Sequence, residues 1–140
     1  MSASSGELAR EFFERFWNQR DDSAFTDLSE PEGLAYQPDG RLSTAQEFRA
    51  IADEILRTLP DFHINISDVL DCGDDAVVRW RATGTHLGDG LGSRATGQKI
   101  TFYGMTWFVF QNGKIVKGWN CWDQGGLLRT LSQDSTPALA

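Results

Sequence analysis

The chain has 140 residues, of which 40% are hydrophobic and 24% are charged, and this is enough for one globular domain with a buried core. Its 13 Lys and Arg residues are outnumbered by 20 Asp and Glu residues, so the net charge of −7 argues against a nucleic-acid or anionic-membrane partner. No stretch is apolar enough to serve as a signal peptide or to cross a membrane. Cys72 and Cys121 are too few for a disulfide framework, so we expect reduced thiols and a cytoplasmic location.

The first part of the chain carries helical patterns. A capping box and a wide apolar face that includes Trp17 predict a helix over residues 6–19. Further N-capping patterns predict a short helix over residues 23–28 and a longer one that begins near residue 44 and is ended by Pro60. A short extended piece between these two helices, residues 34–37, contains Tyr36.

After Pro60 the pattern changes from helices to strands. Alternating side chains predict strands over residues 63–70 and 76–85, and a glycine-rich connection leads from there to a hairpin over residues 99–123. Helices followed by a meander of strands predict an α+β fold, in which a strongly curved antiparallel or mixed sheet wraps around about three N-terminal helices. The interior of such a cone-shaped fold would be an apolar pocket. We assign residues 1–131 to this single domain and residues 132–140 to a loose tail.

The hairpin contains the best candidate for a functional site. Asn112-Gly113 is typical of a tight type I′ turn, and an unbroken ladder from it would pair Phe110/Ile115, Phe108/Lys117, Thr106/Trp119, Gly104/Cys121 and Phe102/Asp123. Trp119, Cys121 and Asp123 would then share one sheet face beside Phe102, Thr106 and Phe108. Asp123 would be an acid at the end of an apolar strand. It would either cap the next turn and reach water, or act as a desolvated general acid or base.

Other kinds of site find little support in the sequence. His63 and His86 belong to different elements, and neither has a second ligand at metal-binding spacing, so we expect no metal site. The glycines of residues 88–92 lack the GK[ST] ending of a phosphate loop and precede a strand, so we expect no nucleotide. The prediction is therefore a site without a cofactor.

Several side chains could assist Asp123 or contact a ligand. Arg79 could hold an anionic intermediate or face solvent, His86 could donate a proton or satisfy a loop carbonyl, and Tyr36 could reach the pocket or pack in the core. Nine Phe, five Trp and two Tyr residues could fill a core or line a pocket for a flat apolar ligand. The residues predicted to contact an apolar small molecule are Trp17, Tyr36, Phe102, Thr106, Trp119 and Cys121.

Four segments of the chain together resemble one protein family. They are LPDFHINISDVLDCGDDAVVRWRATGTHLG, the ATG at residues 95–97, NGKIVKGW, and WNCWDQGGLLRTL, and with the elements between them the resemblance runs from about residue 8 to residue 131. This arrangement is similar to the SnoaL-like polyketide cyclases of the nuclear transport factor 2-like superfamily. The resemblance implies an α+β cone and a cofactor-free intramolecular aldol condensation that closes the last ring of an aromatic polyketide.

The resemblance also implies a role for one residue. The acid/base of the family is the aspartate of the W-x-x-x-D strand, which is Asp123 in this chain. The family's assisting histidine on the neighbouring strand has no counterpart in residues 99–110, where Tyr103 and Thr106 stand instead.

Three functions remain open from the sequence. The first is a small cyclase or a related isomerase, dehydratase, epoxide hydrolase or hydroxylase that acts on an apolar carbonyl compound through Asp123. The second is a module that only binds an apolar small molecule, and the third is an interaction domain with a filled interior. The outward face of the hairpin is also apolar and predicts a homodimer through the outer sheet face; its residues are Tyr103, Met105, Trp107 and Val109.

Overall fold

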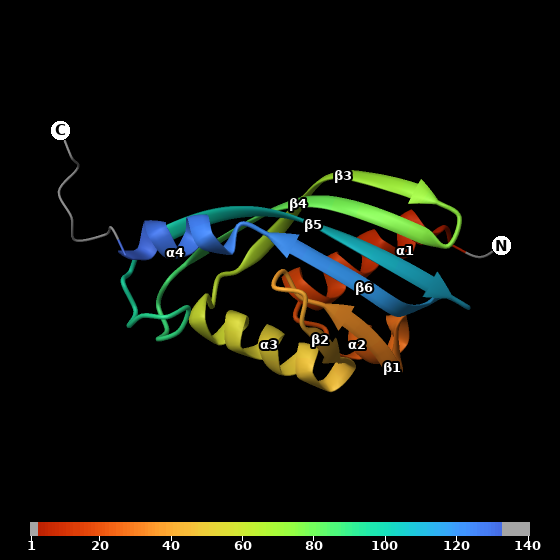
Figure 1. Ribbon diagram of the computed structural model, residues 1–140, viewed down its shortest axis with the longest axis horizontal. Coiled ribbons are helices and arrows are strands. Elements are labelled where there is room, and N and C mark those ends of the chain that lie inside the picture. Colours follow the sequence, from red (N-terminus) through yellow and green to blue (C-terminus); the bar gives the residue numbers. More distant parts are fainter. Residues whose placement is uncertain (1–2, 133–140) are drawn as a thin grey trace.

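The strands of the second half of the chain form most of a six-stranded sheet in the computed structural model, which describes residues 3–132 (Figure 1). An antiparallel meander is made by β3 (His63–Cys72), β4 (Asp75–Thr85), β5 (Lys99–Gln111) and β6 (Lys114–Trp122). Two earlier strands, β1 (Ser29–Tyr36) and β2 (Leu42–Thr44), extend the sheet beyond β6, and β1 runs parallel to β6. The strand order is β2-β1-β6-β5-β4-β3, so the sheet is mixed and stays open.

Helices cover one face and one end of the sheet (Figure 1). The first helix, α1 (Ser5–Phe12), continues into a π-helical segment η1 (Phe13–Asn18), and the capping box predicted at its start forms at Ser4. The other helices are α2 (Asp22–Leu28), α3 (Ala45–Thr58) and α4 (Gln124–Ser132). The α+β fold and the three N-terminal helices are confirmed, whereas α4 was not predicted. None of the described helices has the length and hydropathy needed to cross a membrane.

Aromatic rings fill the space between α1 and the sheet. Phe12 stacks on Phe16 with the ring centroids 5.1 Å apart, and Phe12 and Phe13 both meet the Phe108 ring edge to face at 5.7 Å. Such contacts add to the free energy gained from burial alone. They fix α1 and η1 against the inner face of the sheet.

The hairpin of β5 and β6 follows the predicted ladder for two pairs, Gln111/Lys114 and Phe110/Ile115, and then departs from it. The turn forms at Asn112-Gly113 and Phe110 faces Ile115, but Val109 then pairs with Lys117, which leaves Val116 as an extra residue. A shift of one residue turns all the following side chains of a strand to the other face. The predicted pairs beyond the bulge are therefore wrong; they are Phe108/Lys117, Thr106/Trp119, Gly104/Cys121 and Phe102/Asp123.

The predicted direction of the side chains is correct for β5 and wrong for β6. The inward direction of Phe102, Thr106 and Phe108 on β5 is confirmed, since all three are buried. On β6 the inward residues are Gly118, Asn120 and Trp122, and the outward ones are Trp119 and Cys121. The predicted common face of Trp119, Cys121 and Asp123 beside Thr106 is thus wrong. The predicted tail, residues 132–140, lies outside the described residues from 133 onward, and Ser132 ends α4.

One strand glycine is required by close packing. A Cβ at Gly104 of β5 would overlap the indole ring of Trp80 and lie 2.7 Å from the Cβ of Trp122. We predict that Gly104→Ala lowers the free energy of unfolding by about 1–3 kcal/mol, because the rings must move to admit the methyl group. Urea denaturation measures this loss.

The matched control for that substitution is Gly118→Ala on the neighbouring strand. A Cβ at Gly118 would have its nearest neighbour, the carbonyl oxygen of Trp107, at 3.5 Å, which is ordinary van der Waals contact. Gly118→Ala should therefore stay within about 1 kcal/mol of the wild type. Equal losses for the two variants would contradict the close packing at Gly104.

Candidate functional site

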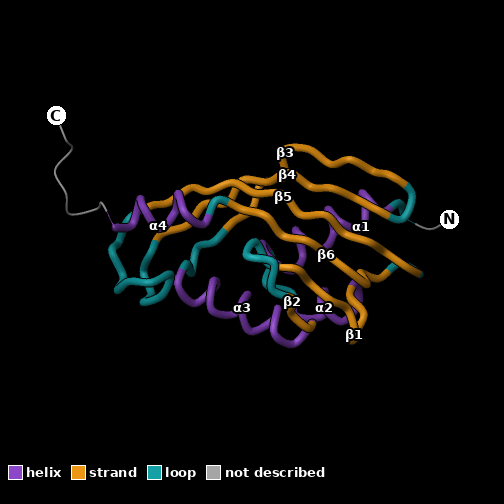
Figure 2. Tube along the Cα trace, in the orientation of Figure 1, coloured by secondary structure: helices purple, strands orange, loops and turns teal. Residues whose placement is uncertain are grey.

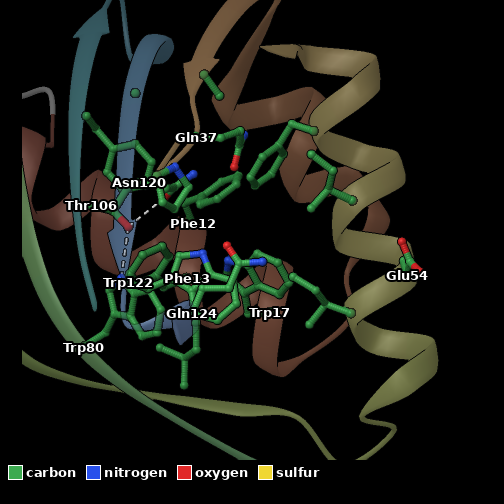
Figure 3. Close-up of a pocket in the computed structure, with 18 of the residues that line it drawn as sticks. Phe12, Phe13, Trp17, Gln37, Glu54, Trp80, Thr106, Asn120, Trp122 and Gln124 are labelled. Atoms are coloured by element: carbon green, nitrogen blue, oxygen red, sulfur yellow. Dashed lines mark hydrogen bonds between the residues drawn. The ribbon is translucent and has the colours of Figure 1, made fainter. Parts of the chain in front are cut away.

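A cavity of about 440 Å³ lies between the inner face of the sheet and the helices α1, α2 and α3 (Figure 3). This volume is within the range of about 300–1,000 Å³ that is typical of small-molecule sites. Its walls are mostly aromatic because the alternating inward residues of the strands meet the apolar faces of the helices. The aromatic lining residues are Phe12, Phe13, Trp17, Phe25, Phe48, Phe62, Trp80, Phe102, Phe108 and Trp122.

Exposed and polar residues surround the edge of the cavity. Asp39 and Arg41 come from the β1–β2 connection, and Gln124 comes from the first turn of α4. Leu91 and Gly92 belong to the glycine-rich loop between β4 and β5, which lies at the same end of the molecule as α4 (Figure 2). The edge is thus built by two connections and the first turn of α4, which are far apart in the sequence.

Three neutral side chains form the polar part of the inner wall. The indole N–H of Trp80 donates to the hydroxyl oxygen of Thr106 at 3.0 Å, and the Thr106 hydroxyl donates to Oδ1 of Asn120 at 2.9 Å (Figure 3). Trp80 and Thr106 are only 6% and 3% exposed, so the hydrogen bond between them is shielded from water. The three residues come from three adjacent strands, β4, β5 and β6.

The structure brings together only some of the predicted ligand-contacting residues. Trp17, Phe102 and Thr106 line the cavity. Tyr36 and Trp119 stack on one another with their ring centroids 5.4 Å apart, and Trp119 lies on the outer face because of the β6 bulge. These two residues and Cys121 do not line the cavity.

Asp123 lies between Trp122 and Gln124, which both line the cavity, but its own side chain is exposed. Its Oδ1 accepts a hydrogen bond from the backbone N–H of Gly126 at 2.9 Å, and its carbonyl oxygen accepts from Leu127 at 3.1 Å. Asp123 therefore caps the first turn of α4. Of the two interpretations that the sequence left open for this residue, these contacts match the cap.

His86 is fully buried, yet it lies outside the cavity lining. Its Nε2–H donates to the carbonyl oxygen of Gly90 at 3.0 Å, and its Nδ1 accepts from the hydroxyl of Thr96 at 3.0 Å. A carbonyl oxygen can only accept, which assigns a hydrogen to Nε2, and the backbone N–H of Thr96 donates to Nδ1 at 3.4 Å, which assigns the lone pair to Nδ1. His86 thus tethers the loop that carries Leu91, in agreement with the interpretation that it satisfies a loop carbonyl.

The base of this loop is fixed by a second polar contact. Asp61 accepts hydrogen bonds from the side-chain hydroxyl and the backbone N–H of Thr85, at 2.7 and 2.6 Å. These bonds favour the charged carboxylate and hold the pKa of Asp61 below its ordinary value. Arg79, the other proposed assistant, is exposed and forms an ion pair with Asp68, away from the cavity lining.

Sequence reasoning missed the inward residues of β6 and the polar groups at the cavity edge. Asn120 and Trp122 could have been found only by recognising the extra residue at Val116. No sequence pattern indicates that Gln37 and Gln124 line the cavity, because their places at its edge are set by tertiary packing. Within residues 3–132, no three His, Cys, Asp or Glu side chains gather as a possible metal ligand set.

The family model described as SnoaL-like polyketide cyclase matches residues 7–131. The chain belongs to the SnoaL-like polyketide cyclase family. A search of curated proteins gives no match for this family member. Solved structures with the same fold include IdmH of Streptomyces antibioticus, described as a candidate polyketide cyclase, with 20% identity over 93% of this chain and 99% of that chain, and a TM-score of 0.84.

Two further solved structures show the same similarity of fold. AclR of Streptomyces galilaeus, described as a candidate hydroxylase, is 20% identical over 92% of this SnoaL-like chain and 96% of its own, with a TM-score of 0.83. A candidate SnoaL-like polyketide cyclase of Jannaschia sp. CCS1 is 20% identical over 95% and 92% of the two chains, with a TM-score of 0.82. At this level of identity the similarity establishes the fold.

The cap at Asp123 makes a prediction that does not depend on function. Asp123→Ala should lower the free energy of unfolding by about 1 kcal/mol, because the N–H of Gly126 loses its acceptor. Asn is also a good N-cap, so Asp123→Asn should lose much less. Amide hydrogen exchange of α4 should accelerate in the Ala variant only, and similar exchange in the two variants would contradict the capping role.

Proposed function

We propose that the protein is a cofactor-independent enzyme of the polyketide cyclase type, which acts on an apolar carbonyl compound held in the cavity. The observation that supports this proposal is the aromatic cavity with a neutral, hydrogen-bonded polar group on its inner wall, made by Trp80, Thr106 and Asn120. Flat aromatic walls suit a flat polycyclic ligand, and a few placed polar groups are enough to orient it. Membership of the SnoaL-like polyketide cyclase family supports the same class of substrate.

The proposed reaction is an intramolecular aldol condensation. A base removes the proton from a carbon that lies between two carbonyl groups, the resulting enolate carbon bonds to a second carbonyl carbon, and the new alkoxide takes up a proton. No external oxidant or reductant is needed for these steps. The C–H bond between two carbonyls is already acidic, so a carboxylate is a sufficient base.

Asp123 is the proposed acid/base. Its position between two cavity-lining residues at the edge of the cavity supports this role. Within residues 3–132, the only hydrogen bond to its carboxylate comes from the N–H of Gly126 to Oδ1, which leaves Oδ2 available for a proton. The same contact would hold the carboxylate in a fixed direction during proton transfer.

A second candidate function is binding without catalysis. The observation that favours it is the neutral interior: among the described residues that line the cavity, the carboxylates are Asp39 and Glu54, and both are exposed. A protein that only holds an apolar molecule needs the cavity and no proton acceptor. The two functions differ in whether a bound substrate exchanges its acidic proton with solvent.

That difference can be measured with 2-acetyl-1-tetralone, a flat compound whose acidic carbon lies between two carbonyls. The wild type should bind it, as shown by quenching of Trp fluorescence, and accelerate the exchange of its acidic proton for deuterium, as followed by NMR. Asp123→Asn should slow the catalysed exchange by about 100-fold or more, because general base catalysis contributes about that much. Binding should be unchanged, since Asn keeps the cap of α4.

Each contrary outcome has a distinct meaning. Exchange at the wild-type rate in Asp123→Asn would show that another group is the base. Binding without any accelerated exchange by the wild type would favour the binding module. A failure of the compound to bind at all would contradict the proposed substrate class.

A homodimer through the outer sheet face is proposed from an exposed apolar patch. The exposed fractions of Tyr103, Met105, Trp107 and Trp119 are 60%, 52%, 47% and 38%, and the Trp107 and Trp119 rings lie 5.6 Å apart. The patch lies on adjacent strands, β5 and β6, and a second copy of the same chain would cover it.

The dimer predicts a change of mass in solution. The double variant Tyr103→Glu, Met105→Glu should be monomeric by light scattering at concentrations where the wild type is dimeric, because charges would be buried at the interface. Leu87→Glu is the matched control, since Leu87 is 59% exposed but lies in the loop after β4. A monomeric wild type at micromolar concentration would contradict the proposal.

The proposed cytoplasmic location rests on the two cysteines. Cys72 and Cys121 are both exposed free thiols. Free thiols persist in reducing compartments. The location itself stays a prediction.

A further inference from the structure

The polar chain on the inner wall of the cavity has a fixed direction. An indole N–H can only donate, so the hydroxyl oxygen of Thr106 is the acceptor for Trp80. The single hydroxyl hydrogen of Thr106 then points to Oδ1 of Asn120. The first direction follows from the chemistry of the tryptophan, and the second from the amide oxygen of Asn120 facing the Thr106 hydroxyl.

This direction determines what Asn120 offers to the cavity. Its amide oxygen is occupied by Thr106, which fixes the orientation of the amide and leaves the nitrogen Nδ2 on the other side. In the part of the chain that the structure describes, no protein acceptor takes a hydrogen bond from Nδ2. Two N–H donors are therefore available to a ligand, and Nδ2 is reachable, since no fully buried side-chain nitrogen or oxygen of the described residues lacks a partner.

The hydrogen-bonded series Trp80–Thr106–Asn120 is also packed tightly against its neighbours. The Trp80 ring packs against Gly104, where no side chain intervenes, and meets the Phe102 ring edge to face at 6.0 Å. Trp80, Thr106 and Asn120 lie on three neighbouring strands with paired backbones. A donor that is fixed before the ligand arrives loses little freedom on binding.

We propose that the Asn120 amide donates a hydrogen bond to a carbonyl oxygen of the bound ligand, and that Thr106 and Trp80 are the residues that position it. This inference rests on the proposed function, which supplies an apolar carbonyl compound in the cavity. During the aldol step the same N–H groups would face the oxygen on which the enolate charge develops. The site thereby selects ligands with a hydrogen-bond acceptor over hydrocarbons of equal shape.

Two tricyclic probes of nearly equal shape test this selection. 9-Fluorenone carries a carbonyl group and fluorene carries none, and quenching of Trp fluorescence reports the binding of each. Asn120→Leu should weaken the binding of 9-fluorenone relative to fluorene by about 2- to 10-fold, the usual contribution of one hydrogen bond. Asn120→Asp should have the same effect, because Asp still accepts from Thr106 but donates nothing.

The positioning role of Thr106 has its own pair of variants. Thr106→Val removes the hydroxyl that holds the amide and should reduce the preference for 9-fluorenone over fluorene. Thr106→Ser keeps the hydroxyl and should restore the preference. A merely structural role would weaken both probes equally in Thr106→Val, and that result would overturn the assignment of Thr106.

A measurement on the wild type tests the same hydrogen bond without any variant, so poor folding of a variant cannot affect it. The probe is 9-fluorenone labelled with carbon-13 at the carbonyl. Its infrared carbonyl band should lie at a lower frequency in the complex than in hexane, because a hydrogen bond weakens the C=O bond. Binding of both probes with an unshifted band would overturn this inference and leave the proposed function standing. If neither probe binds, the proposed function fails and the inference fails with it.

Discussion

One extra residue in β6 determines which side chains reach the cavity. Val116 has no partner in β5, and the strand beyond it is displaced by one position. The neighbouring strand is irregular at the same place, because the β1–β6 register shifts between Ser29 and Leu34. A Cβ at Gly33 of β1 would lie 3.2 Å from the carbonyl oxygen of Ile115, so the two irregularities pack closely against one another. The bulge is thus a packed feature of the sheet, and it turns Asn120 and Trp122 toward the helices.

The outer face of the sheet follows from the same displacement. Trp119 is turned outward, where it stacks with Tyr36 and approaches Trp107, and the amine of Lys117 lies 5.6 Å from its ring centroid. The apolar surface proposed as a dimer interface and the neutral inner wall are therefore linked. A change that removed the bulge would put Asn120 in place of Trp119 on the outer face and Trp119 in place of Asn120 on the inner face.

The sequence predicted the elements well where a local rule determines them. Capping boxes located the starts of α1 and α3, alternation located β3, and the two apolar runs joined by Asn112-Gly113 located β5 and β6. The bulge could not be predicted, because Val116 is an ordinary strand residue and the sign of irregularity lies in Gly33, on a strand from the other half of the chain. Helix α4 was missed because two glycines occupy its first turn, although its cap at Asp123 was recognised as one possibility. The site residues on β6 could not be predicted, because the side chains of β6 that face the cavity depend on its register with β5.

The parallel pairing of β1 with β6 also constrains how the chain can fold. β1 lies near the start of the sequence and β6 near its end, so their contact closes a long loop and forms only after most of the chain is available. During synthesis the N-terminal helices emerge well before the strands that cover them. Their aromatic faces would remain in water until β5 and β6 leave the ribosome, so the incomplete chain exposes apolar surface that is prone to aggregation.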